Sequence, residues 1–447
     1  MTESPTTVDT LIELFRSGQT EAFQRNASEL ESADLADVLA ALQDDERLEA
    51  VRILPPEVSA NALAELPEDV HAEETLAALD PEQAADIVEE LEDDDAADLL
   101  GELEPEEQAR ILGRVEKEDR AEVERLLRYD EETAGGIMTA HLVTVRETDT
   151  ADRALTKIRQ QADVVEDFYQ VFVVDAIERL AGILPLKALV LSAPGRPVRE
   201  IMEGADNTVH PDLDQEEVAR IMARYDLPSV PVVDTNGKLL GRVTFDDVSD
   251  VMEEEHTEDL LRFSGVAADE GLAVALKTAV RTRLPWLYLN LFTAFLAAAV
   301  VVYFKEEIQR TILLAALMPI IAGLGGNAGT QSLAVTVRRL ALGLISRRQG
   351  LEAVAKEALI GATNGLAVGL AIALVTLGVG EDPRLGLLVF LAMTFNVFVA
   401  GTAGAFIPIV LEKIGVDPAI ASSVFVTSLT DIAGFAFLLG LASYLII

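Results

Sequence analysis

The chain has 447 residues, too many for a single hydrophobic core, so several domains are expected. It contains no cysteine, which excludes a disulfide framework, a thiolate metal site and a cysteine nucleophile. The net charge of −41 belongs to one part only, because 65 acidic and 23 basic residues lie at or before Arg262, whereas 11 acidic and 12 basic residues follow it. Such an acidic field repels nucleic acid, so no nucleic-acid partner is expected. It fits cation sensing and a solvated or salt-adapted surface equally well.

Residues 1–130 carry a short repeat. An apolar residue recurs every 12 or 13 positions, at Leu42, Leu54, Leu66, Leu79, Leu91, Leu103, Val115 and Leu127. Prolines stand near the starts of several units, at Pro55, Pro56, Pro67, Pro81 and Pro105. This pattern predicts short helices that stack as an acidic superhelical domain.

Residues 131–250 read as two copies of one α/β unit. The sequence Val171-Phe-Val-Val-Asp175 followed by Gly182 matches Val230-Pro-Val-Val-Asp234 followed by Gly241, at an offset of 59. Ile137-Met138 and Ile201-Met202 open the two copies. The pair resembles tandem CBS modules, a regulatory fold that senses ligands and is not itself catalytic.

The nucleotide signature of CBS modules is nearly intact in the second copy, with Thr244 and Asp247 after Gly241. The first copy has Pro185 and Ala188 where the hydroxyl and the carboxylate belong. Thr244 and Asp247 are therefore only weak nucleotide-site candidates, and we expect ATP to bind weakly or not at all.

An acidic helix is predicted over residues 246–269, because apolar residues keep helical spacing at Val248, Val251, Met252, Leu260, Leu261 and Phe263. We assign residues 251–275 as a linking helix between the modules and the next domain. Its position suits the transmission of a change from one to the other.

Residues 276–447 form a predicted all-α membrane domain. Apolar segments long enough to span a bilayer occupy 286–304, 311–337, 351–379, 385–411 and 419–447. Basic residues are more numerous on one side of the predicted spans. That side has Lys277, Arg281, Arg283, Arg338, Arg339, Arg347, Arg348 and Lys356, and the opposite side has Lys305, Arg310 and Arg384. The positive-inside rule predicts a multi-pass cell-membrane protein, in contact with lipid, with a cytoplasmic N-terminus and an external C-terminus.

Two features interrupt the apolar pattern. The first, residues 323–331 (Gly-Leu-Gly-Gly-Asn-Ala-Gly-Thr-Gln), is expected to unwind or kink the second span and line a pore, although small residues also serve close helix packing. The second is Asp431, an ionisable residue deep in a span with no basic partner in the spans. An intramembrane carboxylate is costly unless it is paired or hydrated, so it indicates a cation or water site.

A carboxylate and backbone carbonyls suit a hard cation such as Mg²⁺ or Ca²⁺. Mg²⁺ sheds water reluctantly, so a hydrated ion fits so sparse a ligand set. Two chains around a symmetry axis would double the site.

In this order, the superhelix, CBS pair, linking helix and five spans resemble the MgtE family of magnesium channels. The specific signatures are Pro319 with Gly325-Gly-Asn-Ala-Gly-Thr-Gln331, then Asp417-Pro418-Ala419 and Thr430-Asp431, with one departure at Val424, where the pattern has a proline. The resemblance implies a homodimer that is not an enzyme, with a Mg²⁺-selective pore between the chains. Its pore ligands would be Asp431, Asn327, Thr330, Gly325 and Gly326.

The resemblance also implies a sensor in which cytoplasmic Mg²⁺ bridges acidic domains and closes the pore through the linking helix. The sensing carboxylates would be Asp214, Glu216, Asp226, Asp247, Asp250, Glu255, Glu258 and Asp259, with the Asp93–Asp95 run, Asp94 and Asp95 above all, as their partner. Close carboxylates repel one another until a divalent ion neutralises them.

Three other functions deserve comparison. A secondary transporter of divalent cations coupled to H⁺ or Na⁺ could use Asp431, but the spans show no inverted repeat. An intramembrane aspartyl protease needs two carboxylates, and the spans supply one. A nucleotide sensor tethered to the membrane would leave Asp431 unexplained.

Overall fold

The computed structural model describes residues 6–67, 70–161, 170–263, 266, 276–342, 344–345, 349–379, 382–416, 418 and 422–445. The chain divides into two compact units, Met1–Glu254 and Glu255–Ile447, and each is described by itself. The boundary falls within one helix, α14 (Phe245–Phe263).

The first unit begins with a helical domain. Its helices are α1 (Thr6–Arg16), α2 (Thr20–Ala27), α3 (Ser32–Ala40), α4 (Asp44–Ile53), α5 (Pro56–Ala64), α6 (Ala72–Ala77), α7 (Pro81–Val88), α8 (Asp93–Gly101), α9 (Pro105–Leu112) and α10 (Lys117–Leu126). Proline is the first residue of α5, α7 and α9. The amide group at this position of a helix makes no hydrogen bond within the helix, so its absence from proline costs nothing. The recurring Leu42, Leu79 and Leu103 are buried, as the repeat predicts.

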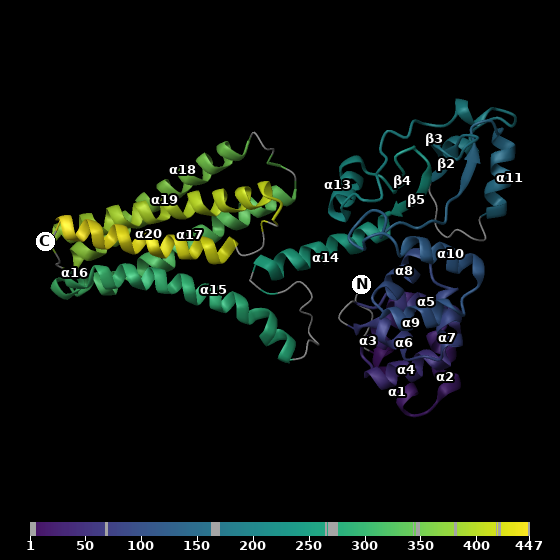
Figure 1. Ribbon diagram of the computed structural model, residues 1–447, viewed down its shortest axis with the longest axis horizontal. Helices are drawn as coiled ribbons and strands as arrows, with labels where there is room; N and C mark the ends of the chain where they lie inside the picture. Colours follow the sequence, from purple (N-terminus) through teal and green to yellow (C-terminus); the bar gives the residue numbers. More distant parts are fainter. Residues whose placement is uncertain are drawn as a thin grey trace. The chain divides into compact units, whose positions relative to one another are not determined.

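The helices stack in two columns. The odd-numbered helices α1, α3, α5, α7 and α9 contact one another in succession, and so do α4, α6, α8 and α10. Figure 1 shows this stack in purple and blue. The predicted superhelix is therefore confirmed, and its core is a continuous set of leucine, valine and alanine side chains.

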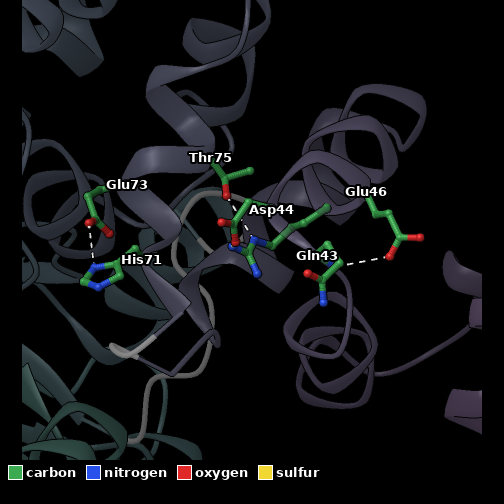
Figure 2. Close-up of polar contacts among 7 residues, drawn as sticks. Gln43, Asp44, Glu46, His71, Glu73 and Thr75 are labelled. Atoms are coloured by element: carbon green, nitrogen blue, oxygen red, sulfur yellow. Dashed lines mark hydrogen bonds and ion pairs between the residues drawn. The ribbon is translucent and has the colours of Figure 1, made fainter. Parts of the chain in front are cut away.

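A buried arginine connects two helices of the stack, α4 and α6. The guanidinium of Arg47 on α4 donates to Asp44 Oδ1 at 2.6 Å and to Thr75 Oγ1 of α6 at 3.1 Å. Figure 2 shows Asp44 and Thr75 converging, and nearby the carboxylate of Glu46 accepts from the backbone amide of Gln43 to close the start of α4. A buried charge must be paired, so these bonds fix the position of α4 relative to α6 in the stack.

The CBS pair follows. Its first module contains β1 (Thr144–Arg146), α11 (Ala151–Gln161), β2 (Gln170–Val174), β3 (Leu180–Pro185), α12 (Leu186–Val190) and the 3₁₀ turn η2 (Val198–Glu200); the second contains α13 (Gln215–Tyr225), β4 (Ser229–Val233) and β5 (Leu239–Thr244). β1 is parallel to β2, and β2–β3 and β4–β5 are antiparallel pairs. The predicted duplication is visible in the strands, since β4 and β5 begin 59 residues after β2 and β3.

The segments that open each copy pair with a strand of the other copy. Thr139, directly after Ile137-Met138, exchanges two backbone hydrogen bonds of 2.9 Å with Arg242 of the second module. Glu203 makes the equivalent pair with Ile183 of the first module, at 2.8 and 3.0 Å. A Cβ on Gly241 would lie 2.7 Å from the Thr139 carbonyl oxygen, so glycine permits the close approach.

The second unit contains the predicted membrane helices. They are α15 (Leu276–Tyr303), the short α16 (Lys305–Arg310), α17 (Leu313–Ala341), α18 (Gly350–Gly378), α19 (Pro383–Lys413) and α20 (Ser422–Leu445). Within the described residues, five helices are long and apolar enough to cross a membrane, and α16 is too short. Large apolar side chains such as Phe292, Leu370 and Phe406 are exposed on them, as suits contact with lipid.

Close packing of small residues holds this unit together. A Cβ on Gly361, Gly365 or Gly369 of α18 would come within 2.6–2.9 Å of the α19 backbone. The three glycines are four residues apart and form one stripe, so the two helix backbones approach closely. α19 is the most enclosed of the five spans.

Two predictions extend beyond the described residues. The predicted helix over 246–269 is confirmed to Phe263, and the remainder of the linking segment to residue 275 lies outside them, apart from Val266. Of the signature Asp417-Pro418-Ala419, only Pro418 is described.

Candidate cation sites

Asp431 lies on α20, the last apolar helix, one residue after the fully buried Thr430. Its side chain is partly buried. Within the described part of the chain, no group donates a hydrogen bond to this carboxylate and no basic side chain pairs with it. A carboxylate held in this way at membrane depth requires water or a cation as its partner.

The helix that carries the glycine-rich stretch corrects one expectation. α17 runs without a break from Leu313 to Ala341, so the predicted unwinding around residues 323–331 is wrong. The reason lies in the facing helices: a Cβ on Gly325 would meet Asn396 at 2.2 Å, and one on Gly329 would meet Val426 at 2.5 Å. These two glycines give room to neighbours, as small residues do in packed membrane helices.

The other face of this stretch is more open. Asn327 is exposed, and Gly326 and Thr330 are partly exposed, whereas Gly325 is buried. Gly326 lies opposite Thr427 of α20, because its Cβ would be 3.8 Å from the Thr427 methyl group. This face therefore runs beside the segment that leads to Asp431, although no described hydrogen bond joins Asn327 or Thr330 to that carboxylate.

Asn396 of α19 was missed at the sequence level. It is fully buried between Gly325 of α17 and Gly434 of α20, and its Nδ2 donates to the Ile321 carbonyl oxygen at 2.8 Å. Its Oδ1 has no hydrogen-bond partner among the described groups. This one amide sets the spacing of three helices around the Asp431 region.

In the first unit, acids of α8 and α14 form a cluster. The buried Asp94 and the partly buried Asp95 of α8 lie close enough to Asp247 of α14 for their charges to interact. Burial, followed by the charge of Asp247, raises the pKa of Asp94 well above its usual value and that of Asp95 to about 7. We call these residues, with Asp250, the α8–α14 acidic cluster.

Asp247 also lies in the first turn of α14. The Thr244 amide donates to its Oδ2 at 3.1 Å, and the Thr244 hydroxyl donates to the same oxygen. Burial raises the pKa of Asp247 to about 6, even though both bonds from Thr244 favour its charged form. Partial burial raises the pKa of Asp250, and the charges of Glu65 and Asp246 add to it.

The remaining predicted sensor acids lie elsewhere. Asp214 and Glu216 stand at the start of α13, where Asp214 Oδ1 accepts from the Glu216 amide at 3.0 Å, and Asp226 caps the far end of the same helix. Glu255 and Glu258 belong to the later turns of α14, where Glu258 pairs with Arg262. The Asp259 side chain lies outside the description. Glu65 and Asp246 join the cluster unpredicted, since nothing local marks them.

The nucleotide candidates differ between the modules as expected. In the second module the Thr244 hydroxyl is engaged by Asp247. In the first module Pro185 ends β3, and Ala188 lies within α12. The first module therefore offers neither a hydroxyl nor a carboxylate at these two positions.

These features define a class: a membrane protein with a helical-repeat domain, a CBS pair and five apolar helices. Three family models match, the MgtE intracellular N domain over residues 30–132, the CBS domain over 134–194 and 198–254, and the MgtE divalent cation transporter domain over 318–441.

Individual relatives agree with the models. A magnesium transporter MgtE of Thermus thermophilus is 37% identical over 333 residues, which are 73% of this chain and 72% of the relative. A magnesium transporter MgtE of Enterococcus faecalis is 36% identical over 323 residues, which are 72% of this chain and 71% of the relative. The chain belongs to the MgtE family.

Among solved structures, the cytosolic domain of the Mg²⁺ channel MgtE in complex with ATP is similar at 38% identity and a TM-score of 0.52, covering 55% of this chain and 99% of that one. The soluble part of a magnesium transporter is similar at 31% identity and a TM-score of 0.51, covering 56% and 97%.

Proposed function

We propose that this protein is a Mg²⁺ channel of the cell membrane and that Asp431 is the cation-binding carboxylate of its pore. The observation that carries the proposal is an ionisable side chain in an apolar helix without a protein partner among the described residues. Mg²⁺ keeps most of its water when bound, so one carboxylate and a few oxygen atoms suffice to hold the hydrated ion. Membership of a family of divalent cation transporters supports this reading.

One carboxylate makes a sparse site, so the proposal includes a homodimer with the pore between its chains. A two-fold axis would bring two copies of Asp431 to the same ion. The open face of α17, with Asn327, Thr330 and the backbone of Gly326, would supply the remaining oxygen atoms. Gly325, the other proposed ligand of this stretch, is buried against Asn396. By the positive-inside rule the first unit would lie in the cytoplasm and the C-terminus outside.

The α8–α14 acidic cluster supports the second half of the proposal, closure by cytoplasmic Mg²⁺. Its carboxylates are crowded and partly withdrawn from water, an arrangement that is unfavourable until a cation or protons neutralise it. α14 carries Asp247 at its start and continues into the second unit, so ion binding there can act on the membrane helices. Asp214, Glu216, Asp226, Glu255, Glu258 and Asp259 remain proposed sensor residues.

Single-channel recording of the full chain in a planar bilayer tests the proposal. We expect discrete Mg²⁺ current steps, fewer openings as Mg²⁺ rises on the side of the first unit, and no current from Asp431→Asn. Mg²⁺ movement without discrete steps, and dependent on a proton or Na⁺ gradient, would establish a carrier instead.

A further inference from the structure

A second group of potential ligands lies where the helical domain meets the CBS pair, apart from the acids that face α14. Asp93 opens α8, Glu122 lies on α10, and His141 stands just before β1. One ligand atom from each residue lies within 4.8 Å of the others. All three belong to the first unit, so their mutual placement is part of one compact body.

The contacts around the imidazole are longer than ordinary hydrogen bonds. His141 Nε2 is 3.4 Å from Glu122 Oε2, and His141 Nδ1 is 3.5 Å from Asp93 Oδ1. N–H···O hydrogen bonds are usually about 2.7–3.2 Å long, so both contacts are loose. The two contacts use different ring nitrogens, and one ion can bind only one nitrogen of His141. The geometry that brings three ligands within reach of a single ion is the grouping of one atom from each residue within 4.8 Å of the others.

The buried carboxylate is oriented as a metal ligand is. Asp93 is only 4% exposed, and its two oxygens accept from the Thr139 hydroxyl at 2.6 Å and from the Ala140 amide at 2.8 Å. Each carboxylate oxygen keeps a further lone pair for an ion. Outer hydrogen bonds of this kind fix the direction of ligating carboxylates.

The charge balance also calls for a cation. Two carboxylates face one imidazole, and among the described residues no lysine or arginine pairs with Asp93 or Glu122. An imidazole suits Zn²⁺ and other late first-row ions, whereas Mg²⁺ prefers oxygen ligands alone. The ligand set therefore differs in kind from the α8–α14 acidic cluster.

We propose that Asp93, Glu122 and His141 form a binding site for a transition-metal ion of the Zn²⁺ type, with one imidazole nitrogen, two carboxylates and a water molecule as ligands. The ion joins α8 and α10 of the helical domain to the segment that leads into the CBS pair. It stabilises this junction independently of Mg²⁺ at the neighbouring cluster.

Calorimetric titration of the full chain in detergent, first stripped with a chelator and then held in excess Mg²⁺, tests the site. Excess Mg²⁺ occupies oxygen-only sites and leaves the imidazole site for Zn²⁺. We expect one Zn²⁺ per chain, and His141→Ala and Glu122→Gln each weakening binding by roughly 10–100-fold or more. Co²⁺ in place of Zn²⁺ should give visible absorption bands that His141→Ala removes.

His210→Ala is the matched control, because His210 also contacts a carboxylate, Asp212 Oδ2 at 3.2 Å, but has no third ligand beside it among the described residues. It should bind Zn²⁺ as the unmodified protein does. The proposal is overturned if Zn²⁺ does not bind in excess Mg²⁺, or if His141→Ala and Glu122→Gln both bind it with unchanged affinity. Glu122 is on the surface, so its variant tests the site even if His141→Ala folds poorly.

Discussion

Asp431 is the residue on which ion conduction depends most directly. Replacing it by alanine should reduce Mg²⁺ flux to background, because the hydrated ion loses its charged partner, while the helices keep their packing. Asp431→Asn preserves size and removes charge, so equal loss in both variants assigns the effect to electrostatics. Flux measured in vesicles with a Mg²⁺-sensitive dye decides it, and normal flux through Asp431→Ala would refute the pore assignment.

Asn396 controls packing, not charge. Asn396→Ala removes the bond to the Ile321 carbonyl oxygen and leaves a gap between Gly325 and Gly434. We expect a loss of about 0.6–2 kcal/mol of stability, the range for hydrogen bonds between membrane helices. Thermal unfolding in detergent measures it, and Asn290→Ala on the exposed side of α15 is the matched control. Equal unfolding temperatures for the two variants would show that Asn396 has no special role.

Single residues also mark the limit of prediction from sequence. Asp431 could be identified because a lone carboxylate in an apolar run is a local signal. Asn396 and His141 could not, since their importance comes from residues 19–75 positions away that only the fold brings near. Glu65 joins the acidic cluster for the same reason.

At the scale of elements, periodic patterns were predictive and glycines were not. The leucine repeat and the offset of 59 depend on local spacing, and the structure confirms both. A glycine inside a helix has two opposite meanings, a break or a close contact, and the facing helix decides between them. Around residues 323–331 the glycines serve close contact, because Gly325 packs against Asn396 and Gly329 packs against Val426.

The contact between α8 and α14 should respond to Mg²⁺. Neutralising Asp94, Asp95, Asp247 and Asp250 together as asparagines removes the repulsion that a bound ion relieves, so closure by Mg²⁺ should weaken. In the unmodified protein we expect Mg²⁺ to raise protease resistance of the first unit, and the variant should show much less of this protection. Limited digestion followed by gel analysis measures it.

In the control variant, neutral residues replace Glu118 and Asp119, two exposed acids of α10 outside the cluster. It should keep the Mg²⁺ protection. Identical digestion of the unmodified protein with and without Mg²⁺ would count against a sensor.

We expect the second module alone to be a poor nucleotide site. The Thr244 hydroxyl is held by Asp247, and Pro185 and Ala188 replace its counterparts in the first module. Losing a charged hydrogen bond costs about 1.5–3 kcal/mol, or roughly one to two decades of affinity. We therefore expect weak ATP binding or none, although a relative's cytosolic domain was solved with ATP. Calorimetric titration of the full chain decides it, and saturation at micromolar ATP would overturn the expectation.

Over the whole molecule, the acidic cluster makes stability depend on pH in an uncommon direction. Burial holds the pKa of Asp95 at about 7 and that of Asp247 at about 6, against roughly 3.9 in an unfolded chain. Between about pH 4 and 7 the folded protein therefore binds more protons than the unfolded chain. The free energy of unfolding then falls as the pH rises through this window, the reverse of the usual behaviour of salt-bridged carboxylates.

In the presence of a chelator, the unfolding temperature of the first unit should be higher at pH 6 than at pH 8. Each kcal/mol is worth on the order of 2–4 °C for a unit of this size. Mg²⁺ should raise the unfolding temperature most at pH 8, because there it replaces the missing protons. Scanning calorimetry of the full chain at both pH values measures the difference, and Asp95→Asn with Asp247→Asn should flatten it. A higher unfolding temperature at pH 8 than at pH 6 without Mg²⁺ would mean that these carboxylates are not crowded in the folded protein.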